Sequence, residues 1–511
     1  MSRLARFMLP WASMLCCLAL ACHKKPVAIP YPIGPAVPEE VIREHVARGD
    51  ELFQAMHLYA WRRAEAAYAI AYGLASRQEI RDKLALTKLL RLTREVDEDI
   101  PCPTLEEDVR FLCAGVNDAR AQALCDLAGA YVAGPVAAAE SMKRVDPSVL
   151  QIDASPLDAY FFALYSRTIG SDAKDDALRK QLNERYKESP LFMYLGLNLG
   201  SPSLTKRFPE FAEAWEFSAE TSFQRNSIKP ARENFAKALS LIPGYTRALN
   251  GLANIFFFTL EDYPTALKGY QDTLRWDSGN TGALFGKGAA LHHLNQFEDS
   301  NAAMDRMLAS DLSRNGRVTL NSVQYYRGEA HYYQAYNYFL MKDRARAREL
   351  IDIAKKDLPQ AEEIHYLSGL LYYHDGQLVP AKADFERAVR TGKNCYGYHY
   401  LGMIDLKTGG PTTASQFLTS SACLERGLRT LQQNIQAAAN LDIEPAEKAA
   451  LRLRMEMKLV EHRDSAADLM QTMLALLRDS LTDPKWKQMY LENIGGLLAK
   501  VKAIQARIQS E

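Results

Sequence analysis

Regularly spaced histidines are the first feature of this chain that could support metal chemistry. His331, His365 and His399 lie 34 residues apart. If this spacing is a structural repeat, the three side chains sit on neighbouring units, at least about 9–10 Å apart, because packed helices approach little closer. Zinc requires nitrogen ligands that converge at about 2.0–2.1 Å. We therefore interpret these histidines as parts of a repeat core or groove, and we predict no metal and no cofactor.

Cysteines offer a second kind of chemistry. Cys102, Cys113 and Cys125 follow one another at spacings of 11 and 12 residues. A zinc ribbon needs close CxxC-type pairs, so this trio favours a disulfide over a metal site. The cysteines beyond residue 100 form an odd set, so one thiol is expected to stay unpaired.

No catalytic motif stands out in the chain. The sequence contains no GxSxG elbow, no GxxxxGK[ST] phosphate loop and no HExxH helix. We therefore predict that the protein is not an enzyme. The alternative is a catalytic site within residues 101–200, which buried carboxylates or histidines there would favour.

Composition indicates a globular protein. The chain has 511 residues, of which 48% are hydrophobic and 24% are charged. Lysine plus arginine equals aspartate plus glutamate, at 62 each, so no net field attracts nucleic acid. We predict no nucleic-acid partner.

The first 21 residues have the pattern of an export signal. A positive start and an apolar run too short to span a bilayer precede Cys22. Residues 18–22 resemble the bacterial lipobox, although Ala19 and Leu20 exchange the order that the family prefers. The resemblance implies cleavage of residues 1–21 and a lipid on Cys22. The alternatives are secretion without a lipid and a retained anchor.

This lipoprotein resemblance implies the bacterial cell envelope as the location. No aspartate follows Cys22, and by the enterobacterial sorting pattern this implies the outer membrane, with the protein facing the periplasm. Residues 22–40 then form a proline-rich tether, because such density favours an extended chain. Residues 27–38 would reach roughly 35–40 Å.

Residues 328–393 repeat themselves at a period of 34 residues. The small residues of the first copy return at equal offsets in the second: Ala335 and Gly369, Ala347 and Ala381, Ala354 and Ala388. This pattern resembles the tetratricopeptide repeat, in which small residues let two antiparallel helices pack closely. The resemblance implies an all-α, right-handed superhelical array of helix pairs with a C-terminal helical cap.

The resemblance also divides the chain. We predict the repeat array over residues 201–427, with one extra residue near Asp262 and an interruption at residues 311–320. Residues 41–200 are predicted to form an irregular helical array with one weak repeat-like hairpin. Residues 428–511 are predicted to form capping helices, since a terminal unit has nothing stacked on it. Partner binding through a coiled coil is the alternative for this last part.

The resemblance assigns a groove to the first helix of each pair. The positions it implies are Asn250, Asn254, Phe257, Phe258, Phe285, His292, His293, Tyr332, Tyr336, Phe339, Tyr366, Tyr373, His374, Tyr396, His399 and Met403. Tyrosine is amphipathic and stiff, so such a face suits an extended peptide or a helix of a partner. The alternative is that many of these tyrosines pack between neighbouring units.

One hairpin of the repeat pattern also suggests a disulfide. Cys395 begins its first helix and Cys423 ends its second helix. Antiparallel packing brings these two ends together, so we predict that they are bonded in an oxidising compartment.

Two functions remain as hypotheses. The first is a lipid-anchored scaffold that binds an envelope protein or peptide, in secretion, pilus or outer-membrane assembly, or polymer export. The second is a helical lipoprotein partner of a periplasmic solute uptake system, binding a small ligand. An enclosed apolar cavity would favour the second hypothesis, and an open tyrosine-lined trough would favour the first.

Overall fold

The structure is a computed structural model that describes residues 37–504 except 99, 101, 115, 117, 134–148, 170–179, 196–201 and 311–319. Every regular element in these ranges is a helix, which confirms the predicted all-α class. The expected lipidation site Cys22, residues 22–36 of the expected tether and most of the interruption at 311–320 lie outside the described residues. No helix in the described ranges is long and apolar enough to cross a membrane.

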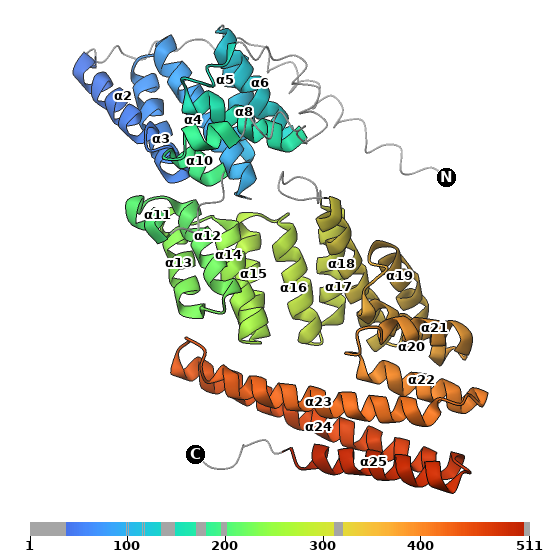
Figure 1. Ribbon diagram of the computed structural model, residues 1–511. Helices are drawn as coiled ribbons and strands as arrows, with labels where there is room; N and C mark the ends of the chain where they lie inside the picture. The colour runs from blue at the N-terminus through green and yellow to red at the C-terminus, as the bar shows by residue number, and fades with distance from the viewer. Residues whose placement is uncertain are drawn as a thin grey trace, which may run out of the picture.

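The N-terminal part is a helical array around one large apolar core (Figure 1). Its helices are α2 (Glu39–Phe53), α3 (Leu58–Leu74), α4 (Gln78–Asp97), α5 (Pro103–Cys113), α6 (Ala119–Ala133), α8 (Pro156–Ile169) and α10 (Pro190–Leu195). Helices α2 and α3 form the repeat-like hairpin. A Cβ on Gly49 would lie 2.4 Å from the ring of Tyr68, so only glycine allows this approach.

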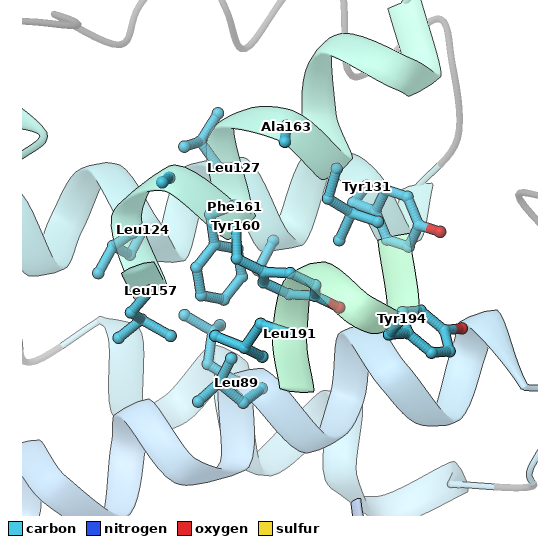
Figure 2. Close-up of a cluster of buried hydrophobic side chains, with 14 of the residues drawn as sticks. Leu89, Leu124, Leu127, Tyr131, Leu157, Tyr160, Phe161, Ala163, Leu191 and Tyr194 are labelled. Atoms are coloured by element: carbon cyan, nitrogen blue, oxygen red, sulfur yellow. The ribbon is translucent and has the colours of Figure 1, made fainter. Parts of the chain in front are cut away.

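Figure 2 shows the centre of that core, where leucines of α4, α6, α8 and α10 surround the rings of Tyr160 and Phe161. The hydroxyls of Tyr131, Tyr160 and Tyr194 lie toward the same side of the cluster. The core is therefore apolar in the middle and polar along one edge.

The repeat array follows as consecutive antiparallel pairs. Its helices are α11 (Pro202–Arg207), α12 (Ala212–Gln224), α13 (Ile228–Leu241), α14 (Thr246–Asn254), η3 (Ile255–Thr259), α15 (Tyr263–Trp276), α16 (Thr281–His293), α17 (Phe297–Ala309), α18 (Leu320–Leu340), α19 (Arg344–Asp357), α20 (Glu362–His374), α21 (Leu378–Ala388) and α22 (Cys395–Thr408). Each first helix packs on the second helix that follows it, for example α18 on α19 and α20 on α21.

Small residues at the repeating positions set the distance between paired helices. Ala335 and Ala381 are fully buried. A Cβ on Gly369 would lie 2.8 Å from the ring of Phe385, and one on Gly402 would lie 2.5 Å from the ring of Phe417. Because helix interiors are close-packed, a side chain at either glycine would push the pair apart. The fold is a tetratricopeptide-like array.

A π-helical turn holds the extra residue of the second unit. In η3, the backbone N–H of Leu260 bonds the carbonyl of Ile255 at 3.1 Å, five residues back. Such a turn takes one residue more than an α-helical turn, so the unit keeps its phase. The extra residue therefore lies in η3 rather than near Asp262. Asp262 instead caps α15, where its side chain accepts from the Thr265 N–H at 3.3 Å.

The predicted boundary at residue 427 lies inside one helix. Helix α23 (Thr413–Ala438) runs through Gly427 without a break, because nothing crowds a position that lacks a side chain there. It is both the second helix of the last pair and the first helix of the cap. Helices α24 (Pro445–Ser480) and α25 (Pro484–Lys502) pack on it.

The cap also returns to the beginning of the array. Figure 1 shows α23 and α24 running beneath the ends of the repeat helices. On α24, Arg454 donates to the carbonyl of Leu260 at 2.6 Å, and Glu447 pairs with Arg232 of α13 at 2.7 Å. The C-terminal helices therefore brace the array lengthwise as well as covering its last unit, which sequence reasoning did not predict.

Two disulfides lie in the described ranges. Cys395 is bonded to Cys423, the pair named from the hairpin pattern, with a Cα–Cα distance of 5.3 Å. Cys113 is bonded to Cys125, which is a disulfide within the N-terminal trio. The first bond joins the start of α22 to the middle of α23.

Candidate functional site

Aromatic rings form a continuous series along the first helices α16, α18 and α20. Phe285 of α16 lies 5.8 Å from Tyr333 of α18 between ring centroids. On the same helix α18, Tyr336 lies 6.5 Å from Phe339, and Phe339 lies 6.1 Å from His374 of α20. We call these rings, with those of Tyr332, Tyr366, Tyr373 and Tyr400, the aromatic series.

The series continues from α20 to α22. Tyr373 lies 5.1 Å from Tyr400. Tyr366 lies 6.3 Å from Tyr400 and 6.0 Å from Phe385 of the second helix α21. Burial raises the pKa of Tyr366 above its ordinary value, which agrees with a ring partly enclosed between units. The structure thus brings the predicted groove tyrosines together, and it packs some of them between units.

The predicted groove residues of the second unit have different surroundings. Phe257 was expected to line the groove, but it is only 8% exposed and its ring packs against Tyr263 and Tyr270. That prediction is wrong, because the π-turn changes the direction of the side chains that follow Ile255. Phe258 is 66% exposed.

The two asparagines of this unit are bonded within the array. Asn254 Oδ1 accepts from the Tyr270 hydroxyl at 2.7 Å. Asn250 Nδ2 donates to Asn280 Oδ1 at 3.0 Å. Both amides therefore hold neighbouring helices, and the ring-bearing helices α18, α20 and α22 are the stronger candidate surface.

An open cleft of about 770 Å³ lies beside the aromatic series. It is bounded by the first half of α18, by the α19–α20 connection and by the start of α20, and we call it the Glu329 cleft. Its lining residues are Tyr325, Glu329, Tyr332, Tyr333, Asp357, Leu358, Pro359, Gln360, Ala361, Glu363 and Ile364. Sequence reasoning named Tyr332 alone among these residues.

A signal for the missed residues was present in the sequence. Tyr325, Glu329 and Tyr333 are spaced four residues apart, and residues at this spacing share one face of a helix. The repeat pattern was phased only from residue 328, so the helical turns before it were not assigned to a face. The structure shows that α18 begins at least two turns earlier.

The three regularly spaced histidines have separate environments. His365 is buried, with Nδ1 3.1 Å from Asp384 Oδ1 and Nε2 2.9 Å from the carbonyl of Pro359. His399 stacks on Phe417, and burial lowers its pKa to about 4. His331 contacts only the backbone of its own helix, at the carbonyl of Arg327. In the described ranges no group of three metal-ligating side chains converges.

Buried carboxylates do occur near the N-terminal core, but at its junction with the repeat array. Arg94 is fully buried, and its Nη1 donates to Glu213 Oε1 of α12 at 2.9 Å. Asp97 accepts from the Tyr131 hydroxyl at 2.7 Å. The hydroxyl of Tyr194 also bonds Asp97 and Glu98. These polar groups bond one another, so the network joins the two parts of the molecule.

Comparisons with known proteins agree with the fold. No protein-family model and no curated protein matches the chain. Among solved structures, it is similar to PilF of Pseudomonas aeruginosa, with 19% identity, 40% of this chain and 89% of that chain covered, and a TM-score of 0.36. PilW, described as a type IV pilus biogenesis factor, has 16% identity, 46% and 99% coverage, and a TM-score of 0.33. A tetratricopeptide repeat protein of Parabacteroides merdae has 12% identity, 56% and 98% coverage, and a TM-score of 0.32.

Proposed function

We propose that the protein is a lipid-anchored scaffold of the bacterial envelope that binds a protein or peptide partner along its aromatic series. The observation that supports this most directly is the unbroken run of rings across α16, α18, α20 and α22. Aromatic side chains supply most of the energy at protein interfaces, because they bury a large area at a low entropy cost. A run that crosses several repeat units matches an extended ligand better than a compact one.

The geometry of the Glu329 cleft favours a peptide over an enclosed small molecule. Tyr325 is 51% exposed, and the cleft is open to solvent along one side. Small-ligand sites generally bury most of the ligand surface in an apolar pocket. A partner of a solute uptake system would need such a pocket, so the scaffold is the proposal that we prefer.

The envelope location rests on the N-terminal sequence. Cys22 follows the apolar export signal, and the proline-rich tether would separate the folded helices from the lipid. Replacing Cys22 with serine, followed by separation of membrane and soluble fractions, tests the anchor. We expect release from the membrane, and unchanged retention would contradict the lipoprotein proposal.

Site-specific photo-crosslinking tests the binding surface. A photoreactive residue at position 325 replaces an exposed ring of the cleft, and one at position 379 replaces Val379, which is 84% exposed on the second helix α21. We expect an envelope protein to be crosslinked from position 325 and not from position 379. Equal crosslinking from both positions, or none from position 325, would argue against the aromatic series as the binding surface.

A further inference from the structure

The Glu329 cleft has an unusual balance of charge. Glu329 and Glu363 both line it, and neither has a hydrogen-bond or ion-pair partner within the described part of the chain. Arg327 of α18 does not neutralise them, because its Nε donates to Asp357 Oδ2 at 2.7 Å and its Nη2 bonds the other oxygen of the same carboxylate. The cleft therefore presents two carboxylates without a cation.

The two carboxylates lie near enough to affect each other. Burial raises the pKa of Glu329, and the negative charge of Glu363 raises it further. A like charge nearby disfavours the ionised form of a carboxyl group, and a cation placed between the two would relieve this. The cleft is thus electrostatically suited to a positively charged ligand group.

Tyrosine rings surround these carboxylates. Tyr325, Tyr332 and Tyr333 line the same cleft, and their hydroxyls have no hydrogen-bond partner among the described residues. The centroids of Tyr332 and Tyr333 lie 5.9 Å apart. Aromatic faces attract cations, more strongly when water is excluded. The unpartnered hydroxyls can bond the backbone of a peptide that lies across the cleft.

We propose that the Glu329 cleft receives an arginine side chain of the partner peptide. A guanidinium is planar, so it can stack on tyrosine rings while its several N–H groups donate to two carboxylates at once. A lysine ammonium is a strongly hydrated point charge and gains less from flat aromatic walls. This inference rests on the proposed function, and it adds the chemical identity of one anchoring residue of the partner.

The test compares arginine with its uncharged isostere citrulline. Two capped nonapeptides, Gly-Ser-Leu-Ala-X-Ala-Leu-Ser-Gly with X as arginine or citrulline, are titrated by calorimetry into the full chain purified in detergent. We expect the citrulline peptide to bind about tenfold more weakly or worse, the scale of one desolvated cation contact. The selectivity should disappear in the double variant Glu329→Gln, Glu363→Gln.

A matched variant controls for the change in net charge. Glu349 is exposed on the second helix α19, outside the cleft, so Glu349→Gln should keep the arginine selectivity. Thermal melting of all variants checks folding, and Glu363→Gln alone serves where the double variant does not fold. This exposed single change is expected to reduce the selectivity in the same direction.

Three results would overturn the arginine proposal. They are equal binding of both peptides by the unaltered chain, binding of neither at about 1 mM, and selectivity that survives in the Glu329→Gln, Glu363→Gln variant. Failure of the scaffold proposal itself would appear differently. In that case position 325 would crosslink no envelope protein, whether or not the isolated cleft prefers arginine to citrulline.

Discussion

Exposure separates the tyrosines near the candidate site into two groups. Tyr366 lies among Phe385, Tyr400 and neighbouring leucines of the repeat core, whereas Tyr325 is 51% exposed at the edge of the Glu329 cleft. A ring of the first kind contributes mainly to folding, and a ring of the second kind has surface available for a partner. The two groups therefore predict different consequences of truncation.

Alanine at these two positions should separate stability from binding. We expect Tyr366→Ala to lower the free energy of unfolding by about 2–3 kcal/mol, somewhat less than for a fully buried aromatic ring. Tyr325→Ala should change it by less than about 0.5 kcal/mol while weakening partner capture. Thermal melting and partner pull-down, measured side by side, check both. Loss of stability in Tyr325→Ala, or unchanged capture, would remove Tyr325 from the binding surface.

Buried histidines give the protein a predictable response to acid. Burial lowers the pKa of His57 and of His399 to about 4, against about 6.5 for an ordinary histidine. Between these values the unfolded chain binds more protons, so stability is fully present above about pH 6.5 and falls as the pH falls toward about 4. At pH 5 each histidine should cost about 2 kcal/mol of stability.

Melting curves at pH 7.5 and pH 5 measure this effect. We expect His399→Phe, which keeps a ring against Phe417, to show a smaller loss of stability between the two pH values than the unaltered protein. The control is His462→Phe on the exposed surface of α24, which should leave the difference unchanged. Equal pH sensitivity of the two variants would mean that His399 does not titrate as its burial implies.

Pairs of helices are the units of the fold, and the sequence predicted these units best where size alone decides the packing. Gly369 and Phe385 were recognisable because a residue without a side chain recurs opposite a large ring. The π-turn at Ile255 could be counted as one extra residue but not located, since no residue type requires it. Gly427 indicated a break to sequence reasoning, but an isolated glycine is tolerated in a helix when neighbouring helices fix the chain.

Sequence reasoning was least able to predict long-range polar contacts. The Glu329 cleft depends on the packing of α18 against the α19–α20 connection, and its carboxylates have an ordinary solvated appearance in the sequence. The pairing of Arg454 with the carbonyl of Leu260 joins residues 194 positions apart. Neither contact follows from a repeat period, because both arise from how whole elements meet.

The disulfide of the last pair should stabilise this element. Cys395 and Cys423 close a loop of 28 residues, and constraining a loop of that length in the unfolded chain contributes roughly 3–4 kcal/mol in the chain-entropy account. We expect Cys395→Ser, Cys423→Ser to lower the stability by this order, as measured by urea unfolding. Thiol labelling of the native protein provides the control, and labelling of both cysteines would show that the bond is absent.

The whole molecule is joined at two places beyond the succession of helix pairs. The cap returns to the second unit through Arg454 and Glu447, and the N-terminal array meets α12 through Arg94 and Glu213. At the second junction the Arg94 guanidinium lies 3.5 Å from the ring centroid of Tyr194, enclosed by aromatic side chains. A solenoid of independent units would bend at such points, so both junctions are expected to fix the orientation of the aromatic series.

Removing Arg94 tests whether the N-terminal array and the repeat array unfold as one body. Both Arg94 and Glu213 are fully buried, and loss of one partner of such a pair leaves an uncompensated charge that costs about 3–5 kcal/mol. We expect Arg94→Met to cause this loss, and to let the N-terminal helices exchange amide hydrogens at lower denaturant than α18 to α22. Adding Glu213→Gln should restore much of the stability, because the remaining amide still accepts from the Leu58 N–H, which now bonds Glu213 at 3.2 Å. Arg110→Met, at an exposed pair on α5, is the control and should change stability by less than about 0.5 kcal/mol. A single cooperative transition of unchanged midpoint in Arg94→Met would show that the apolar core alone holds the two arrays together.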